Sequence, residues 1–152
     1  MSAPRLPQFD YKGNFAYSIT ICCNQGKNHF TKDATVQPCL NILKNVMDQE
    51  GFDIYAYCFM PDHLHLLLIG KNENVDMNKT IKLYKQKTGY WFKQQYKEKI
   101  WQNSYYDHII RKEEGIENVA LYIFNNPIRK GLVNDFIDYP YLGSFVFDIK
   151  EV

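Results

Sequence analysis

The sequence lacks the features that mark secreted, membrane-spanning and nucleotide-binding proteins. Its four cysteines are Cys22, Cys23, Cys39 and Cys58. They form no CxxC pair and no even spacing, which favours reduced, mostly buried thiols over a disulfide framework. No stretch approaches the ~20 apolar residues that span a bilayer, and residues 1–10 do not resemble a secretion signal. The glycines are isolated, so no phosphate-binding glycine loop is present. We therefore expect a cytoplasmic protein without membrane association.

Net charge is also nearly absent, at +1 over 152 residues, which argues against indiscriminate coating of nucleic acid. The charge is nevertheless unevenly distributed. Residues 79–99 contain seven lysines and one acid, a local excess of +6, and the remaining chain carries −5. Such a basic stripe suggests one face for a polyanion, although the solvated side of an ordinary helix has the same composition.

The hydrophobic pattern predicts a single α+β domain over residues 1–152. Strands are expected at 15–23, 52–59, 63–69 and 104–110, and helices at 36–49, 77–95 and 113–124, with Gly89 a candidate for a kink or break. Residues 1–13 read as an N-terminal arm and residues 134–152 as an irregular C-terminal tail that packs on the body. Two β-α-β halves around a central hairpin predict a ferredoxin-like (RRM-like) antiparallel sheet with helices packed on one face.

The tripeptide His63-Leu64-His65 begins the third predicted strand. Strand side chains alternate between faces, so both histidines project from one face and Leu64 from the other. Two imidazoles on one face can share a divalent cation. The alternative is a pair of strand-end histidines that hydrogen-bond to nearby backbone. A structural zinc site is disfavoured, because the nearest cysteine, Cys58, is expected to pack in the core.

The last predicted helix has Tyr122 on the flank of its apolar stripe, and Asn126 follows four residues later on the same flank. This spacing allows Tyr122 to direct its oxygen toward a metal-bound phosphate while Asn126 offers an oxygen ligand. A boundary tyrosine that simply packs with its hydroxyl in water is the alternative.

Three segments carry a family resemblance: YAYCFMPDHLHLLL at 55–68, WQNSYYDHIIRKEE at 101–114 and ALYIFNNPIRKGLV at 120–133. In content, order and spacing they resemble the HUH single-tyrosine transposases, especially the REP-associated tyrosine transposases of bacterial genomes. The resemblance spans residues 15–133. The His-hydrophobic-His element is moderately specific by itself, and the downstream Tyr-Ile-x-x-Asn-Pro-x-Arg-x-Gly-Leu-Val segment makes the combination strong.

The resemblance implies that His63 and His65 bind a catalytic divalent cation, Mg²⁺ or Mn²⁺, with Asn126 as a supplementary ligand and Tyr122 as the nucleophile. It also implies a homodimer that acts in the cytoplasm, at the nucleoid, on single-stranded DNA folded into REP-like hairpins. The chain ends soon after the tyrosine helix, which puts in doubt any DNA contacts that longer relatives make with a tail.

Competing nucleophiles stand on the fourth predicted strand. Alternation sends Tyr106 and His108 to one face and Tyr105 to the other. One tyrosine is expected to pack and the other to line a DNA groove, while His108 either assists the site or is structural. The candidate phosphate contacts are Lys79, Lys82, Lys85, Arg111, Arg129 and Lys130. For each lysine a solvated surface role is the alternative.

The expected chemistry is metal-assisted transesterification. Tyr122 attacks phosphorus to give a 5′-phosphotyrosine and a free 3′-OH, and a later 3′-OH rejoins the DNA without ATP. One rival is a non-catalytic nucleic-acid-binding module of the same fold, although no RNP-like aromatic strand is present. A second is a metal-independent structural or partner-binding domain, and a third is a nuclease of the family that no longer moves any element.

Overall fold

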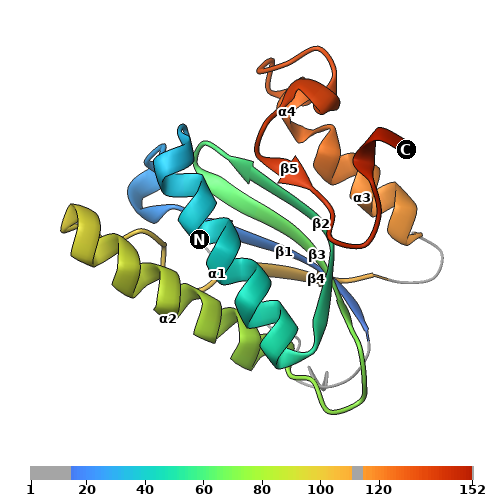
Figure 1. Ribbon diagram of the computed structural model, residues 1–152, viewed down its shortest axis with the longest axis horizontal. Helices are drawn as coiled ribbons and strands as arrows, with labels where there is room; N and C mark the ends of the chain where they lie inside the picture. The colour runs from blue at the N-terminus through green and yellow to red at the C-terminus, as the bar shows by residue number, and fades with distance from the viewer. Residues whose placement is uncertain (1–14, 111–114, 152) are drawn as a thin grey trace.

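A five-stranded antiparallel sheet organises the chain (Figure 1). The computed structural model describes residues 15–110 and 115–151. The strands are β1 (Ala16–Cys22), β2 (Phe52–Met60), β3 (His63–Gly70), β4 (Tyr106–Ile109) and β5 (Leu142–Gly143), in the order β4-β1-β3-β2-β5. The helices are α1 (Asp33–Glu50), α2 (Met77–Tyr96), α3 (Ile116–Phe124) and α4 (Asn126–Arg129), with 3-10 turns at Asn24–Gly26, Phe136–Asp138 and Ile149–Glu151. The expected α+β antiparallel arrangement is confirmed.

The first face of the sheet is sealed by α1 and α2. Every second residue of the central strands is fully buried on this side, Ile19 on β1 and Leu64 and Leu66 on β3 among them. These side chains meet the apolar stripes of the two helices, represented by Leu43 and Tyr84. Burial of this strand pattern against two amphipathic helices forms the main core.

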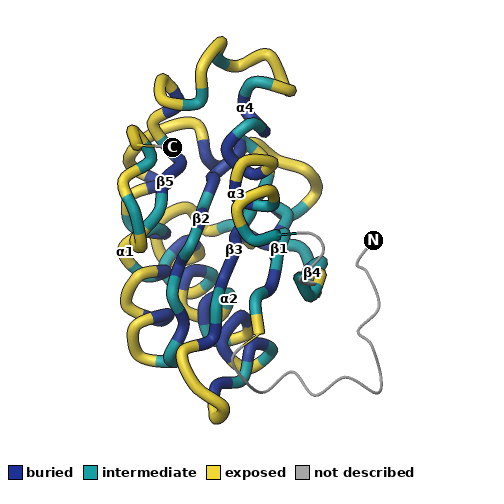
Figure 2. Tube along the Cα trace, turned by 90° about the vertical axis from the view of Figure 1, so that its right-hand side faces the viewer, coloured by how far each residue is buried: buried dark blue, intermediate teal, exposed yellow. Residues whose placement is uncertain are grey.

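The opposite face is partly covered by α3, which corrects the expectation that all helices lie on one face. Ala120, Ile123 and Phe124 of α3 pack on a second cluster that includes Cys58 of β2 and Leu67 of β3. A β-bulge between Ile54 and Ala56 shifts the register of β2 against β3, so that Ala56 and Cys58 face α3. The dark buried stretches of β2 and β3 run beneath α3 in Figure 2.

Local interactions set the end of α1 and the start of α2. α1 stops at Gly51, which adopts φ 86° and donates its N–H to the carbonyl of Met47. A Cβ at this position would lie 2.7 Å from Val75 Cγ1. Asp76 caps the start of α2, where its side chain accepts from the Lys79 N–H. The helix continues through Gly89, the candidate position for a kink or break, as one element. No helix within the described ranges is both long and apolar enough to cross a membrane.

The tail is more regular than its sequence indicates. Leu142 and Gly143 pair with Cys58 and Tyr57 as strand β5, at the sheet edge. The Tyr139 hydroxyl donates to the carbonyl of Phe59 over 2.6 Å in a buried position. The two-residue strand is too short to show a period-2 pattern, which is why the sequence did not predict it. The expected arm at 1–13 lies outside the described residues.

Candidate active site on the open face of the sheet

A two-residue turn, Pro61-Asp62, joins β2 to β3 and places His63 at the start of β3. Both turn carbonyls accept hydrogen bonds from other segments: Pro61 from the Phe30 N–H over 3.0 Å and Asp62 from the Cys23 N–H over 2.9 Å. The turn is therefore held from two sides, and the first residue of β3 begins from a fixed position.

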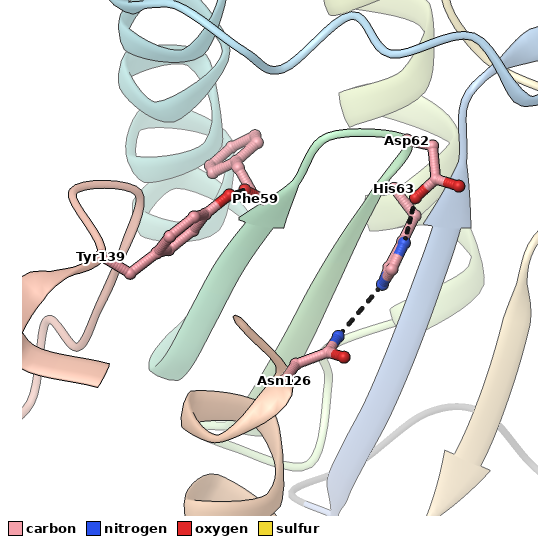
Figure 3. A network of polar contacts seen from close by, with 5 residues as sticks. All are labelled: Phe59, Asp62, His63, Asn126 and Tyr139. Atoms are coloured by element: carbon pink, nitrogen blue, oxygen red, sulfur yellow. Dashed lines mark hydrogen bonds and ion pairs between the residues drawn. The ribbon is translucent and has the colours of Figure 1, made fainter. Parts of the chain in front are cut away.

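His63 has a defined tautomer. Its Nδ1 lies 2.8 Å from Asp62 Oδ1 and its Nε2 lies 3.2 Å from Asn126 Nδ2 (Figure 3). Since the carboxylate only accepts and the amide nitrogen only donates, Nδ1 carries the proton and Nε2 presents its lone pair. A carboxylate behind a histidine is the usual way to orient an imidazole toward a cation. The sequence did not lead us to single out Asp62, although its place directly before the first histidine is the signal that could have shown its role.

His65 lies two residues further on the same face, with its ring centroid 6.4 Å from that of His63. Its Nε2 is 3.3 Å from the Ser18 hydroxyl of β1. Burial, with smaller contributions from the nearby His63 and Arg129, lowers the pKa of His65 to about 4. The ring is therefore neutral near pH 7 and keeps a lone pair available.

Asn126 comes from the segment that follows the tyrosine helix. α3 ends at Phe124, and Asn126-Pro127 opens the short helix α4 instead of ending the helical path. The Asn126 side chain is only 7% exposed and reaches β3 across the sheet face. Its nitrogen meets His63, whereas the sequence led us to expect the oxygen. A half-turn of the amide would exchange the two atoms.

Tyr122 does not share the buried position of Asn126. Its side chain is 59% exposed, and the guanidinium carbon of Arg129 lies 3.8 Å from its ring centroid. This is a close cation–π contact. Arg129 also lies close enough to His65 to lower the pKa of that ring. The nucleophile candidate is thus linked to the histidine pair through one arginine.

The residues present fit a divalent cation bound by nitrogen and amide oxygen. No group of three or more His, Cys, Asp or Glu side chains gathers anywhere in residues 15–110 and 115–151. The donors available are His63 Nε2, the His65 ring and the Asn126 amide. Two imidazoles and an amide leave room for water and a phosphate oxygen, as a catalytic site requires.

Cysteine does not complete this set. Cys58 is fully buried among Ala56, Met60 and Leu67, and burial raises the pKa of its thiol to about 12. It packs in the core, as expected. All four cysteines are free thiols.

The rest of this face is an open polar surface formed by β1 and β4. In the sheet register Thr20 lies opposite both His65 and Tyr106, and Ser18 lies opposite His108. Tyr106 and His108 therefore share the face of the histidine pair. Tyr105 points into the main core, where its hydroxyl contacts Asn78.

The candidate phosphate contacts are spread over several surfaces. Lys79, near the start of α2, lies 4.0 Å from Glu50. Lys82 and Lys85 line cavities beside α2, and Lys130 is exposed at the end of α4. Arg129 contacts Tyr122 and lies near His65, as described above. Arg111 lies outside the described residues.

Comparisons with known proteins agree with this geometry. The model of the family described as "Transposase IS200 like" matches residues 11–126. A Haemophilus influenzae protein described as a REP-associated tyrosine transposase is 29% identical over an alignment 152 residues long. The alignment includes 91% of this chain and 84% of the relative.

Two solved structures share the fold. A REP-associated tyrosine transposase bound to a REP hairpin superposes with a TM-score of 0.77 at 20% identity, over 92% of this chain and 82% of the other. A transposase-like protein from Deinococcus radiodurans gives a TM-score of 0.56 at 19% identity, over 81% and 97% of the two chains. At these identities the structures support the fold alone.

Proposed function

Because the chain belongs to the IS200-like transposase family, whose members are enzymes acting on DNA, we propose that it is a metal-dependent single-stranded DNA endonuclease and strand-transferase. It cleaves next to REP-like hairpins through a 5′-phosphotyrosine intermediate. The whole chain, residues 1–152, acts as one transposase domain.

One observation carries the proposal: α3 and α4 connect the nucleophile to the histidine strand. Asn126 contacts His63, and three residues later Arg129 stacks on Tyr122. A chain that used its histidines only for structure would have no need for an exposed tyrosine held under an arginine. The arrangement fits a phosphate bound between cation, guanidinium and phenol.

His63, His65 and Asn126 would hold the cation, which we propose to be Mg²⁺ or Mn²⁺. When bound, it supplies Lewis acidity at the scissile phosphate. Asp62 keeps the Nδ1 proton of His63 in place and so directs Nε2 to the site. Burial of His65 keeps its ring unprotonated near neutral pH.

The protein's own groups account for both phosphoryl-transfer steps, cleavage of the DNA and its rejoining. Tyr122 Oη forms a bond to phosphorus as the P–O3′ bond breaks; the phenol loses its proton and the leaving 3′ oxygen gains one. Arg129 places a positive charge beside the ring and next to the reacting phosphate. A 3′-OH then attacks the phosphotyrosine, restores the phenol and joins the DNA, so the number of phosphodiester bonds is conserved.

The substrate and setting are part of the same proposal. We infer a single-stranded DNA substrate carrying a REP-like hairpin, a homodimer as the active form, and action in the cytoplasm at the nucleoid. The family resemblance supports these assignments. Arg129, Lys82 and Lys130 are proposed phosphate contacts; Arg111 is proposed on the sequence alone.

A denaturing-gel assay for covalent protein–DNA adduct tests the proposal. The assay combines purified protein with Mn²⁺ and end-labelled hairpin oligonucleotides from the DNA that flanks its own gene. The Tyr122→Phe variant and a wild-type sample with EDTA are run beside it. We expect an adduct that both changes abolish. An adduct that survives in Tyr122→Phe would move the chemistry to Tyr106, which lies on the histidine face of the sheet. Tight hairpin binding without any adduct would favour the non-catalytic binding module.

A further inference from the structure

A basic cavity lies beside α2, away from the histidine pair. It has a volume of about 490 Å³ and runs between α2 and residues 99–103. Its charged lining consists of Lys82, Lys85, Lys93 and Lys99. A second cavity of about 380 Å³ shares Lys82 and Lys85 with it and extends along the same helix. Together they form an elongated basic groove, which we call the α2 groove.

Three lysines of the α2 groove, Lys82, Lys93 and Lys99, form no ion pair with a carboxylate in the part of the chain that the structure describes. No Asp or Glu is part of its lining in the described chain. Lys85 donates to the carbonyls of Gln102 and Ser104, which holds the 99–103 segment in place. Lys99 donates to the neutral amide of Asn103 and keeps its charge. Lys82 and Lys93 are exposed on α2, with no ion pair or hydrogen bond to their ammonium groups among residues 15–110 and 115–151.

Part of the lining is apolar and rigid. Ile100 and Trp101 line the groove while only 1% and 3% exposed. The Trp101 Nε1–H donates to Thr88 Oγ1 over 2.7 Å, which fixes the indole. Aliphatic stems of the lysines add further apolar surface. Lysine ammonium groups beside the apolar surface of their own stems suit a ligand that has both phosphates and flat bases.

The groove starts close to the histidine site. The Gln102 N–H donates to the carbonyl of Cys22 over 2.9 Å, and Cys22 lies opposite His63 in the β1–β3 register. Two steps of about 4.8 Å between neighbouring chains separate the backbones of Gln102 and His63 by about 10 Å. A strand whose scissile phosphate lies at His63 can therefore continue over the end of β1 into the groove.

We propose that the α2 groove binds the single-stranded DNA segment that flanks the scissile phosphate. Lys82, Lys93 and Lys99 contact its phosphates, and a base packs on the aliphatic stems of these lysines, above the buried side chains of Ile100 and Trp101. This inference rests on the proposed function, because it takes the same DNA strand as the ligand. In this inference the lysines of the α2 groove bind the unpaired flank of the DNA, and other surfaces of the protein bind the hairpin.

Fluorescence anisotropy in EDTA, where no cleavage occurs, provides the test. The probes are one hairpin oligonucleotide with single-stranded flanks and the same hairpin with blunt ends. The variant is Lys82→Gln/Lys93→Gln. The control is Lys44→Gln/Lys71→Gln, which removes the same charge from lysines that lie beside Asp48 and Asp53. Thermal melting checks that both variants are folded.

We expect the groove variant to bind the flanked hairpin about tenfold more weakly, with a salt slope smaller by roughly 1.4, since each single-strand phosphate contact contributes about 0.7. Binding of the blunt hairpin should equal that of the control variant. Equal losses on both probes, or none, would overturn the inference while leaving the proposed function standing. Competition by poly-glutamate as effective as that by the flanking strand would also overturn it. Wild-type protein that binds neither hairpin would overturn both.

Discussion

On the face of the sheet beneath α1 and α2, Leu64 and Leu66 are fully buried, whereas on the opposite face His63 and His65 remain partly exposed. These four residues are consecutive neighbours on one strand. The first face is continuous apolar packing. The second has a smaller core under α3 and an open polar surface on β1 and β4.

The difference places the main core and the proposed metal site one residue of strand register apart. A slip by one position would exchange the two sets of side chains. The fixed turn at Pro61-Asp62 and the bulge in β2 therefore help to set which side chains reach each face. The following predictions test whether the two faces can be changed independently.

The largest effect is expected from His63→Gln/His65→Gln. Loss of both imidazoles removes the cation and several kcal/mol of transition-state stabilisation, so adduct formation should fall by about a thousandfold. Stability in urea should change by no more than about 1 kcal/mol, because these positions lie outside the main core. Adduct formation at the wild-type rate would show that the second face does not hold the chemistry.

The converse change is Leu66→Ala on the first face. The leucine is fully buried, and its truncation should lower the free energy of unfolding by about 3 kcal/mol through lost burial and a cavity. Urea titration measures this loss, with Ser18→Ala on the open face as the control. A loss below about 1 kcal/mol would mean that the first face is not the source of stability.

The pH dependence of stability should report on His65. Its pKa is lowered to about 4 in the folded chain, against about 6.5 when unfolded. The unfolded state thus binds more protons between these values. The resulting stability is complete above about pH 6.5 and is lost as the pH falls toward 4, by about 2 kcal/mol at pH 5. Urea titrations in EDTA at several pH values would detect it, and His65→Gln should lack this component. An identical pH profile in both proteins would contradict the assignment.

The smallest effect is expected from Asp62→Asn. The asparagine no longer fixes the Nδ1 proton of His63 as strongly, and Mn²⁺ affinity measured by calorimetry should fall on the order of tenfold. Stability should be nearly unchanged, since the Asp62 side chain is 51% exposed. Asp53→Asn, which breaks the ion pair with Lys71 at the far end of the sheet, is the matched control. Equal Mn²⁺ affinities for the two variants would show that Asp62 does not orient the histidine.

The sequence alone determined the features that depend on neighbouring residues. Strand alternation placed His63 and His65 on one face, with Leu64 on the other, and helical periodicity predicted α1 and α2. The antiparallel ferredoxin-like sheet followed from the order of these elements. Each of these inferences uses a period of two or of about 3.6 residues, which consecutive side chains encode directly.

Only the tertiary structure decided which distant segments meet. The bulge in β2 and the apolar stripe of α3 put that helix on the histidine face, and α4 brought Asn126 to His63 and Arg129 to Tyr122. The pairing of β5 with β2 and the lining of the α2 groove likewise join residues far apart in the chain. Such contacts depend on register and packing between elements, and no local pattern in the sequence specifies them.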